Sequence, residues 1–183
     1  MSSVPARAIA AEVRMLALDV DGVMTDGRLW YGAEGEVLKA FHVRDGLGIR
    51  LLMHEGVDVA IISARRAPAL DRRIRDLGIA HVFVGRDDKE SALDEILETL
   101  RVPATQIAYV GDDILDLPVM RRIGLPIAVA DAHPLVREEA AWVTSLPGGT
   151  GAVREVADAL LHARGRLREA SESLLATGLR RGP

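Results

Sequence analysis

Two carboxylates stand at the end of a short apolar segment near the start of this sequence. Residues 15–20 read MLALDV, and Asp19 and Asp21 lie two positions apart at its end. Charged groups at the end of a buried strand are costly without a partner, and a divalent cation held by carboxylate oxygens would neutralise them. The alternative is a surface turn with acidic caps, but the hydrophobic segment that leads directly into the pair favours the cation.

The same arrangement recurs in the second half of the chain. The apolar segment 107–110 is followed by Gly111 and by Asp112, Asp113 and Asp116. Asp112 and Asp116 are four residues apart, so one helical turn would bring both to the same side. The ordinary alternative for Asp113 is that it caps that helix.

A hydroxyl and an ammonium group follow two further segments. Ser63 comes directly after the apolar run 57–62, where a helix cap is its ordinary role. Lys89 stands where a helix should begin, and the helix dipole disfavours a cation there by about 0.3–1 kcal/mol. Lys89 is therefore either an ordinary solvated lysine or a functional residue that is kept at this position despite the unfavourable helix dipole.

Short apolar runs alternate with amphipathic helical patterns along most of the chain. The expected strands are residues 15–20, 57–62, 81–84, 107–110, 127–129 and 142–144, and the expected helices are 46–54, 68–77, 89–100 and 152–163. This alternation predicts an α/β fold with a Rossmann-like parallel sheet and helices on both faces. Two extended pieces around Gly32-Ala33-Glu34-Gly35 predict a β-hairpin over 28–43, inserted after the first strand. Chemistry in such folds lies at the carboxyl ends of the strands, where the acids, Ser63 and Lys89 fall.

Length and composition bound the class of protein. The 183 residues are 49% hydrophobic, with a net charge of −4 and no cysteine. We expect an N-terminal extension (1–12), one domain (13–165) and a C-terminal tail (166–183). No apolar run is long enough to cross a membrane, no secretory signal is visible at the start, and no basic surplus indicates nucleic-acid binding. The absence of cysteine excludes a disulfide scaffold and fits the reducing cytoplasm.

In chain order, the strand-DxD, strand-Ser, Lys and strand-GDDxxD motifs resemble those of the haloacid dehalogenase-like superfamily of aspartate-nucleophile phosphatases. The resemblance covers about residues 13–165. It implies that Asp19 is the nucleophile that becomes an aspartyl-phosphate. It also implies that Asp21 protonates the leaving alcohol and then activates water.

The resemblance assigns roles to the other motif residues as well. It implies Mg²⁺ held by Asp19, the backbone carbonyl of Asp21, and Asp112. Ser63 would then bind a phosphoryl oxygen, and Lys89 would balance the charge of nucleophile and phosphate. Asp116 would bind a metal-ligated water or orient Lys89, with Asp113 in support.

The spacing of the motifs leaves no room for a cap domain. Between Asp21 and Ser63 there is only the hairpin and one helix, and between Ser63 and Lys89 only one helix and one strand. Many relatives insert a cap at one of these places. A capless site is open to water unless something else covers it.

The sequence segments around these motifs are similar to those of the family of 3-deoxy-D-manno-octulosonate 8-phosphate phosphatases. The matching segments are DVDGVMTDG, YGAEGEVLKAFHVRDGLGIRLL, IISAR, DLGI, YVGDDILDLPVM, VADAHP and GGTGAVREV. The resemblance implies hydrolysis of that sugar-acid phosphate for lipopolysaccharide synthesis in Gram-negative bacteria. It also implies a homotetramer in which hairpins associate and a neighbour's surface and tail close the site.

The hairpin offers two interpretations of its apolar side chains. They are Leu29, Trp30, Val37, Leu38 and Phe41. These residues form either ordinary intrachain core or an interface between copies of the chain. We favour the interface, because a lone hairpin that projects from a sheet cannot bury both of its faces.

Arg65 is the position that distinguishes the closest alternatives. Octulosonate-type members of the family have Arg directly after a Ser/Thr-Gly pair, which corresponds to Ser63-Ala64 in this chain. A guanidinium at this position can form a bidentate pair with the carboxylate of the sugar acid. Sialic-acid-type relatives, which act on N-acylneuraminate or KDN 9-phosphate, tend to have Glu. A helix-surface arginine is the ordinary alternative for Arg65. Gly22, Ala64 and Arg44 are further candidates for binding phosphate or substrate.

Two other classes of protein remain open at this stage. A non-catalytic assembly module could keep the fold, although intact Asp19, Asp21, Lys89 and Asp112 argue against it. A phosphorylation receiver domain also combines acids, Ser/Thr and Lys. It would place its phosphorylated Asp at the end of a middle strand, where this chain has Ser63 or a glycine turn.

Overall fold

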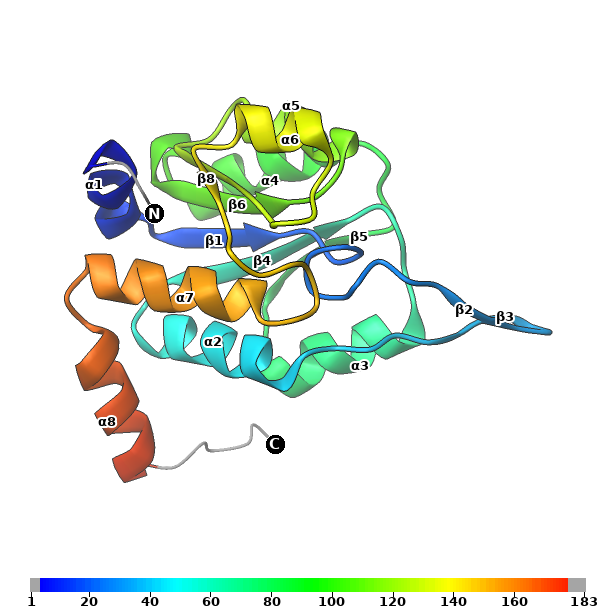
Figure 1. The fold of residues 1–183 in the computed structure, drawn as a ribbon, viewed down its shortest axis with the longest axis horizontal. Coiled ribbons are helices and arrows are strands. Elements are labelled where there is room, and N and C mark those ends of the chain that lie inside the picture. The colour runs from blue at the N-terminus through cyan, green and yellow to red at the C-terminus, as the bar shows by residue number, and fades with distance from the viewer. Residues whose placement is uncertain (1–3, 178–183) are drawn as a thin grey trace.

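A six-stranded parallel sheet is the core of the protein (Figure 1). A computed structural model describes residues 4–177. The strands are β1 (Met15–Leu18), β4 (Asp58–Ser63), β5 (His81–Val84), β6 (Ile107–Gly111), β7 (Leu125–Ala128) and β8 (Trp142–Val143), in the order β5-β4-β1-β6-β7-β8. All neighbours in the sheet are parallel. The central position of β1 places the residue that follows it between the ends of β4 and β6.

Helices cover both faces of the sheet. One face carries α2 (Val43–His54), α3 (Pro68–Leu77) and α7 (Ala152–Ala163), and the other carries α4 (Lys89–Leu100), α5 (Leu117–Met120) and α6 (Pro134–Glu139) (Figure 1). The terminal helices α1 (Val4–Glu12) and α8 (Leu167–Thr177) pack at one end, α1 against α7 and α8 against α2 and α7. Two short 3₁₀ turns, η1 (Ala104–Gln106) and η2 (Ile114–Asp116), flank β6. None of the described helices is both long and apolar enough to cross a lipid bilayer.

The central strands are buried on both faces, which explains their unbroken apolar sequences. Every residue of β1 and β6 is buried, as a parallel strand between two helical layers requires. The core is almost wholly aliphatic, and Tyr109 in β6 is its largest fully buried side chain. This packing gives the strand ends fixed positions from which polar side chains can project.

The predicted strands and long helices are confirmed to within a few residues. The short helices α5 and α6 were not predicted, because four and six residues are too few for a periodic pattern. Within the predicted tail, residues 167–177 form α8. Residues 178–183 of that tail, and residues 1–3 of the N-terminal extension, lie outside the described part of the chain.

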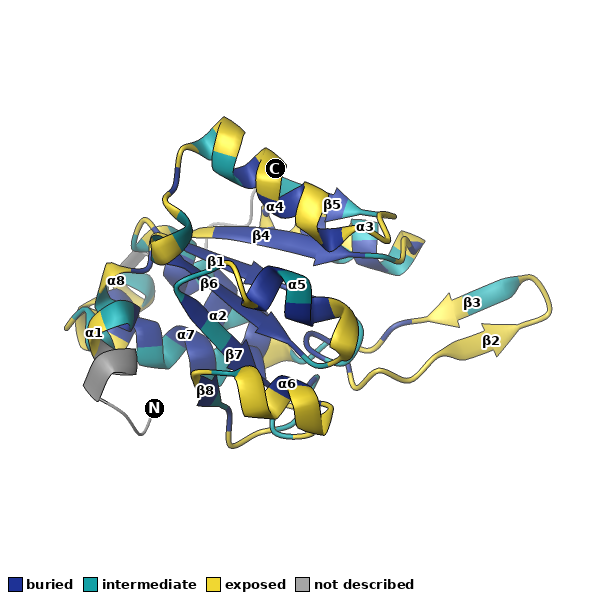
Figure 2. Cartoon of the chain, turned by 90° about the horizontal axis from the view of Figure 1, so that it is seen from above, coloured by how far each residue is buried: buried dark blue, intermediate teal, exposed yellow. Residues whose placement is uncertain are grey.

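The predicted hairpin is confirmed and projects away from the sheet (Figure 2). It consists of β2 (Trp30–Gly32) and β3 (Gly35–Leu38), paired antiparallel with each other. Four of its apolar side chains are exposed, while Phe41 packs against the core. Within residues 4–177 no second domain is inserted beside it, so the site has no cap of its own.

Candidate active site

The predicted site residues meet at the carboxyl ends of β1, β4 and β6. They surround a cavity of about 240 Å³ lined by Asp19, Asp21, Ser63, Ala64, Arg65, Lys89, Asp112, Asp113, Leu115 and Asp116. Arg44 is the one predicted residue that the structure places elsewhere. It lies on the first turn of α2, is exposed, and is not among the residues that line the cavity.

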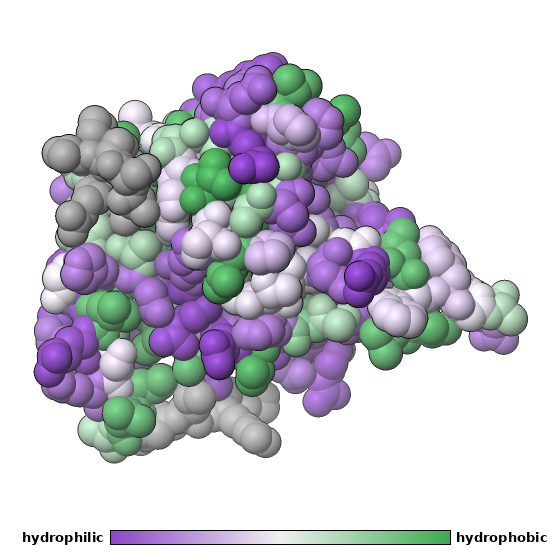
Figure 3. Space-filling view, in the orientation of Figure 1, coloured by the Kyte–Doolittle hydropathy of each residue, from purple (hydrophilic) through white to green (hydrophobic). Residues whose placement is uncertain are grey.

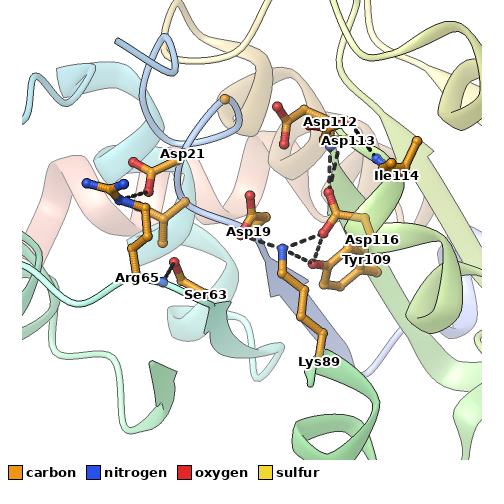
Figure 4. Close-up of polar contacts among 12 residues, drawn as sticks. Asp19, Asp21, Ser63, Arg65, Lys89, Tyr109, Asp112, Asp113, Ile114 and Asp116 are labelled. Carbon is orange, nitrogen blue, oxygen red and sulfur yellow. Dashed lines mark hydrogen bonds and ion pairs between the residues drawn. The ribbon is translucent and has the colours of Figure 1, made fainter. Parts of the chain in front are cut away.

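Lys89 joins the ends of β1 and β6 through two ion pairs. Its Nζ donates to Asp19 Oδ1 at 2.8 Å and to Asp116 Oδ1 at 2.6 Å (Figure 4). All three side chains are buried. The unfavourable place of Lys89 at the start of α4 is therefore offset by two carboxylates, while Asp88 caps the helix instead.

Tyr109 belongs to this cluster and was missed by the sequence analysis. Its hydroxyl donates to Asp116 Oδ1 at 2.6 Å, and the backbone N–H groups of Asp112 and Asp113 donate to Asp116 Oδ2. Asp116 is thus an acceptor on both oxygens and holds Lys89 in place. The available signal was one tyrosine inside an aliphatic strand, in a chain with only 3% aromatic residues.

Burial and mutual repulsion raise the pKa values of two carboxylates at the cavity, those of Asp19 and Asp112. Burial, and then the charge of Asp116, raises the pKa of Asp19 to about 6 although Lys89 opposes this. Burial, followed by the charges of Asp19 and Asp116, raises the pKa of Asp112 to about 8. Burial alone would lower the pKa of Lys89, but Asp19 and Asp116 outweigh it and raise that pKa, so the ammonium stays charged.

The donor set fits a hard divalent cation. Carboxylate oxygens of Asp19, Asp112 and Asp116 lie within 4.8 Å of one another, and oxygen is the ligand that Mg²⁺ prefers. Because Asp116 already accepts hydrogen bonds on both oxygens, Asp19 and Asp112 are the better direct ligands. Gly22 (φ +91°) makes room for them, since a Cβ at this position would stand 2.0 Å from Asp112 Oδ2.

A second charged cluster lies on the other side of Asp19. Arg65 Nε stands 3.6 Å from a carboxylate oxygen of Asp21 (Figure 4), and Lys39 forms an ion pair with the same carboxylate. Ser63 Oγ accepts a hydrogen bond from the Arg65 backbone N–H at 3.3 Å, so Ser63 shapes the turn as a local cap would. Lys39 was not predicted at the site, since nothing in the hairpin sequence indicates that this lysine points inward.

Comparisons with known proteins agree with this geometry. A family model described as haloacid dehalogenase-like hydrolase matches residues 76–154. The 3-deoxy-D-manno-octulosonate 8-phosphate phosphatase of Yersinia pestis is 52% identical over 88% of this chain and 87% of its own length. Its crystal structure superposes with a TM-score of 0.88, covering 90% of this chain and 89% of that chain at 51% identity.

A second relative was solved with ligands. The crystal structure of 3-deoxy-D-manno-octulosonate 8-phosphate phosphatase from Moraxella catarrhalis is a complex with magnesium, phosphate and a KDO molecule. It is 37% identical, has a TM-score of 0.87, and covers 94% of this chain and 97% of that chain. On this identity and coverage, the chain belongs to the family of 3-deoxy-D-manno-octulosonate 8-phosphate phosphatases, within the haloacid dehalogenase-like hydrolases.

Proposed function

We propose that this protein is a Mg²⁺-dependent phosphatase that converts 3-deoxy-D-manno-octulosonate 8-phosphate and water to 3-deoxy-D-manno-octulosonate and phosphate. The observation that carries the proposal is the buried Asp19 at the end of the central strand, paired with Lys89 and facing a cavity beside Asp112. The activity of close relatives supports the substrate.

In the first step, a carboxylate oxygen of Asp19 attacks phosphorus and the bond to the sugar oxygen breaks. Lys89, 2.8 Å from Asp19, holds this carboxylate in place and places positive charge beside the transferring phosphoryl group. Asp21 gives its proton to the leaving alcohol. Mg²⁺, when held by Asp19, the Asp21 carbonyl and Asp112, supplies charge that reduces repulsion between carboxylate and phosphate.

In the second step, water attacks the phosphorus of the aspartyl-phosphate on Asp19. Asp21, now ionised, takes a proton from that water, and phosphate leaves with Asp19 restored. Asp21 lines the same cavity as Asp19, and its carboxylate is held by Lys39 and lies near Arg65. Ser63 also lines the cavity, and its hydroxyl would donate a hydrogen bond to a phosphoryl oxygen.

Arg65 is the residue that we propose selects the sugar acid, by pairing with its carboxylate. Arg65→Glu should lower kcat/KM for octulosonate 8-phosphate by about 10- to 100-fold, the value of one or two charge-assisted hydrogen bonds. The measurement is phosphate release from octulosonate 8-phosphate, a nine-carbon sialic-acid-type 9-phosphate and ribose 5-phosphate.

Arg66→Glu, a change at the exposed neighbour of Arg65, is the matched control. A wild-type preference for the nine-carbon substrate would contradict the substrate assignment, and unchanged specificity in Arg65→Glu would contradict the role of Arg65.

We also propose that the protein works as a homotetramer whose hairpins meet. Apolar side chains gather on the projecting hairpin (Figure 3), where Trp30 is 53% and Val37 66% exposed. Water-exposed patches of this kind mark interaction surfaces. The expected mass in solution is four chains, and Val37→Glu should shift it toward one, whereas Glu34→Gln at the hairpin turn should not. A wild-type monomer with full activity would exclude the shared site.

The cytoplasm is the compartment that we propose for this enzyme. The support is the absence of cysteine, which fits a reducing environment. Fractionation of cells that express the protein checks this assignment.

A further inference from the structure

Four charged side chains form a compact cluster beside the cavity. Asp21 comes from the loop after β1, Glu36 and Lys39 come from the hairpin, and Arg65 comes from the loop after β4. Lys39 pairs with Asp21 and, at 3.0 Å, with Glu36. Arg65 pairs with Glu36 at 2.9 Å and lies 3.6 Å from Asp21. The hairpin therefore contacts the site of its own chain through two charged residues.

Two members of the cluster, Lys39 and Glu36, are better shielded from water than ordinary surface ion pairs, while Asp21 and Arg65 are partly exposed. The Lys39 side chain is 1% exposed and the Glu36 side chain 13% exposed. Surface pairs contribute about 0–1 kcal/mol, but a charge this far removed from water is costly unless its partner is present. Glu36, in β3, and Lys39, directly after β3, thus hold each other where the hairpin chain meets Asp21 and Arg65.

Glu36 fixes the orientation of the Arg65 guanidinium. Nη2 of Arg65 donates to Glu36 Oε2 at 2.9 Å and to the Tyr31 hydroxyl at 3.3 Å, while Nε faces Asp21. Nη1 makes no hydrogen bond or ion pair with the side chains of residues 8–176, the side chains that the structure describes. The guanidinium is therefore held through Nη2 and Nε, and Nη1 remains for an anionic ligand of the cavity that Arg65 lines.

An arginine left without such support would bind a carboxylate less well. The Arg65 side chain is 42% exposed, so without a fixed partner it would sample many rotamers. Ordering such a side chain costs up to about 2 kcal/mol, and this cost is avoided when a second residue orders it before the ligand arrives.

We propose that Glu36 is a positioning residue for substrate specificity: it acts through Arg65 to select phosphate esters that carry a carboxylate. The inference rests on the proposed function, because it describes how that same site recognises the acid. Glu36 touches neither the phosphoryl group nor the nucleophile. Its effect appears in the KM for acidic substrates and not in the chemical step.

The test compares Glu36→Gln, Arg65→Ala and the double variant, each with Mg²⁺. Glu36→Gln keeps the shape of the side chain but removes the charge that holds Arg65. We expect it to raise the KM for octulosonate 8-phosphate about tenfold, with kcat changed less than about twofold. The kcat/KM for ribose 5-phosphate, which has no carboxylate, should stay within about twofold. Glu34→Gln, the same change at an exposed glutamate of the same hairpin, should behave as wild type.

The double variant decides whether Glu36 acts through Arg65. If it does, Glu36→Gln costs nothing further in the Arg65→Ala background, because the group it positions is gone. Additive losses would overturn the inference and assign the effect to hairpin stability or subunit assembly. An equal loss on ribose 5-phosphate would overturn it as well.

The wild-type protein separates this inference from the function on which it rests. Failure of the wild type to release phosphate from octulosonate 8-phosphate would reject the proposed function and the inference together. An active wild type with Glu36→Gln indistinguishable from Glu34→Gln would reject the positioning role alone.

Discussion

Asp19→Asn is expected to lower phosphate release from octulosonate 8-phosphate by at least about 10³-fold, on the scale seen when a catalytic nucleophile is removed. An amide oxygen is a poor nucleophile and carries no charge to bind a cation. The fold should survive, because Asn has the same shape and burial already disfavours the charged form of Asp19, whose pKa is raised to about 6.

Single-turnover phosphate release and thermal unfolding, both measured on Asp19→Asn, check this result. Asp26→Asn is the matched control, because Asp26 is an exposed carboxylate of the same loop. Intact-mass measurement after rapid quenching should find one added phosphoryl group on the wild type and none on Asp19→Asn. A variant that kept a tenth of the wild-type rate would show that Asp19 is not the nucleophile.

Removing Mg²⁺, or replacing Asp112 with Asn, should also lower phosphate release by about 10²-fold or more, since oriented charge is the main catalytic contribution in phosphoryl transfer. The metal-free protein should lose stability as pH rises. A folded-state pKa of about 8 for Asp112, against an ordinary 3.8, means that the folded chain binds this proton more tightly than the unfolded chain. That contribution is present at pH 4 and is lost as pH rises toward 8.

Thermal unfolding between pH 5 and 8, with and without Mg²⁺, measures this effect. We expect metal-free Asp112→Asn to be more stable than metal-free wild type at pH 8 by about 1–3 kcal/mol, part of the full value of the pKa shift. Mg²⁺ should stabilise the wild type most at pH 8 and the variant little. Asp87→Asn, at an exposed carboxylate before Lys89, is the control. Equal Mg²⁺ stabilisation of both proteins at pH 8 would contradict the assignment of Asp112 as a ligand.

The sequence alone predicted that the acids, Ser63 and Lys89 come together, because most of these residues follow strands. Asp19, Ser63 and Asp112 lie at or directly after the ends of apolar segments, and parallel strands bring their carboxyl ends to one edge. Lys89 was recognisable because its position conflicts with the helix dipole. The unbroken aliphatic runs of the central strands likewise allowed the parallel sheet to be predicted from the sequence.

The contacts among Asp21, Glu36, Lys39 and Arg65 could not be predicted in the same way. The contact between Arg65 and Glu36 joins residues 29 positions apart, and it depends on where the fold places β3 relative to the loop after β4. No periodicity encodes that placement, so Lys39 and Glu36 look like ordinary hairpin charges in the sequence. Conversely, Arg44 was predicted near the substrate, yet the first turn of α2 presents it to solvent.

The hairpin forms no ladder with the main sheet, and this separation bears on how such an enzyme changes during evolution. Substitutions in β2 and β3 leave the packing of β1, β4 and β6 untouched, so they carry little penalty for folding. A lineage can therefore explore new substrates by altering the hairpin and the residues it holds, while the nucleophile, its lysine and the acidic ligands stay fixed. Part of the proposed substrate recognition is therefore carried by a hairpin that the packing of the main sheet does not require.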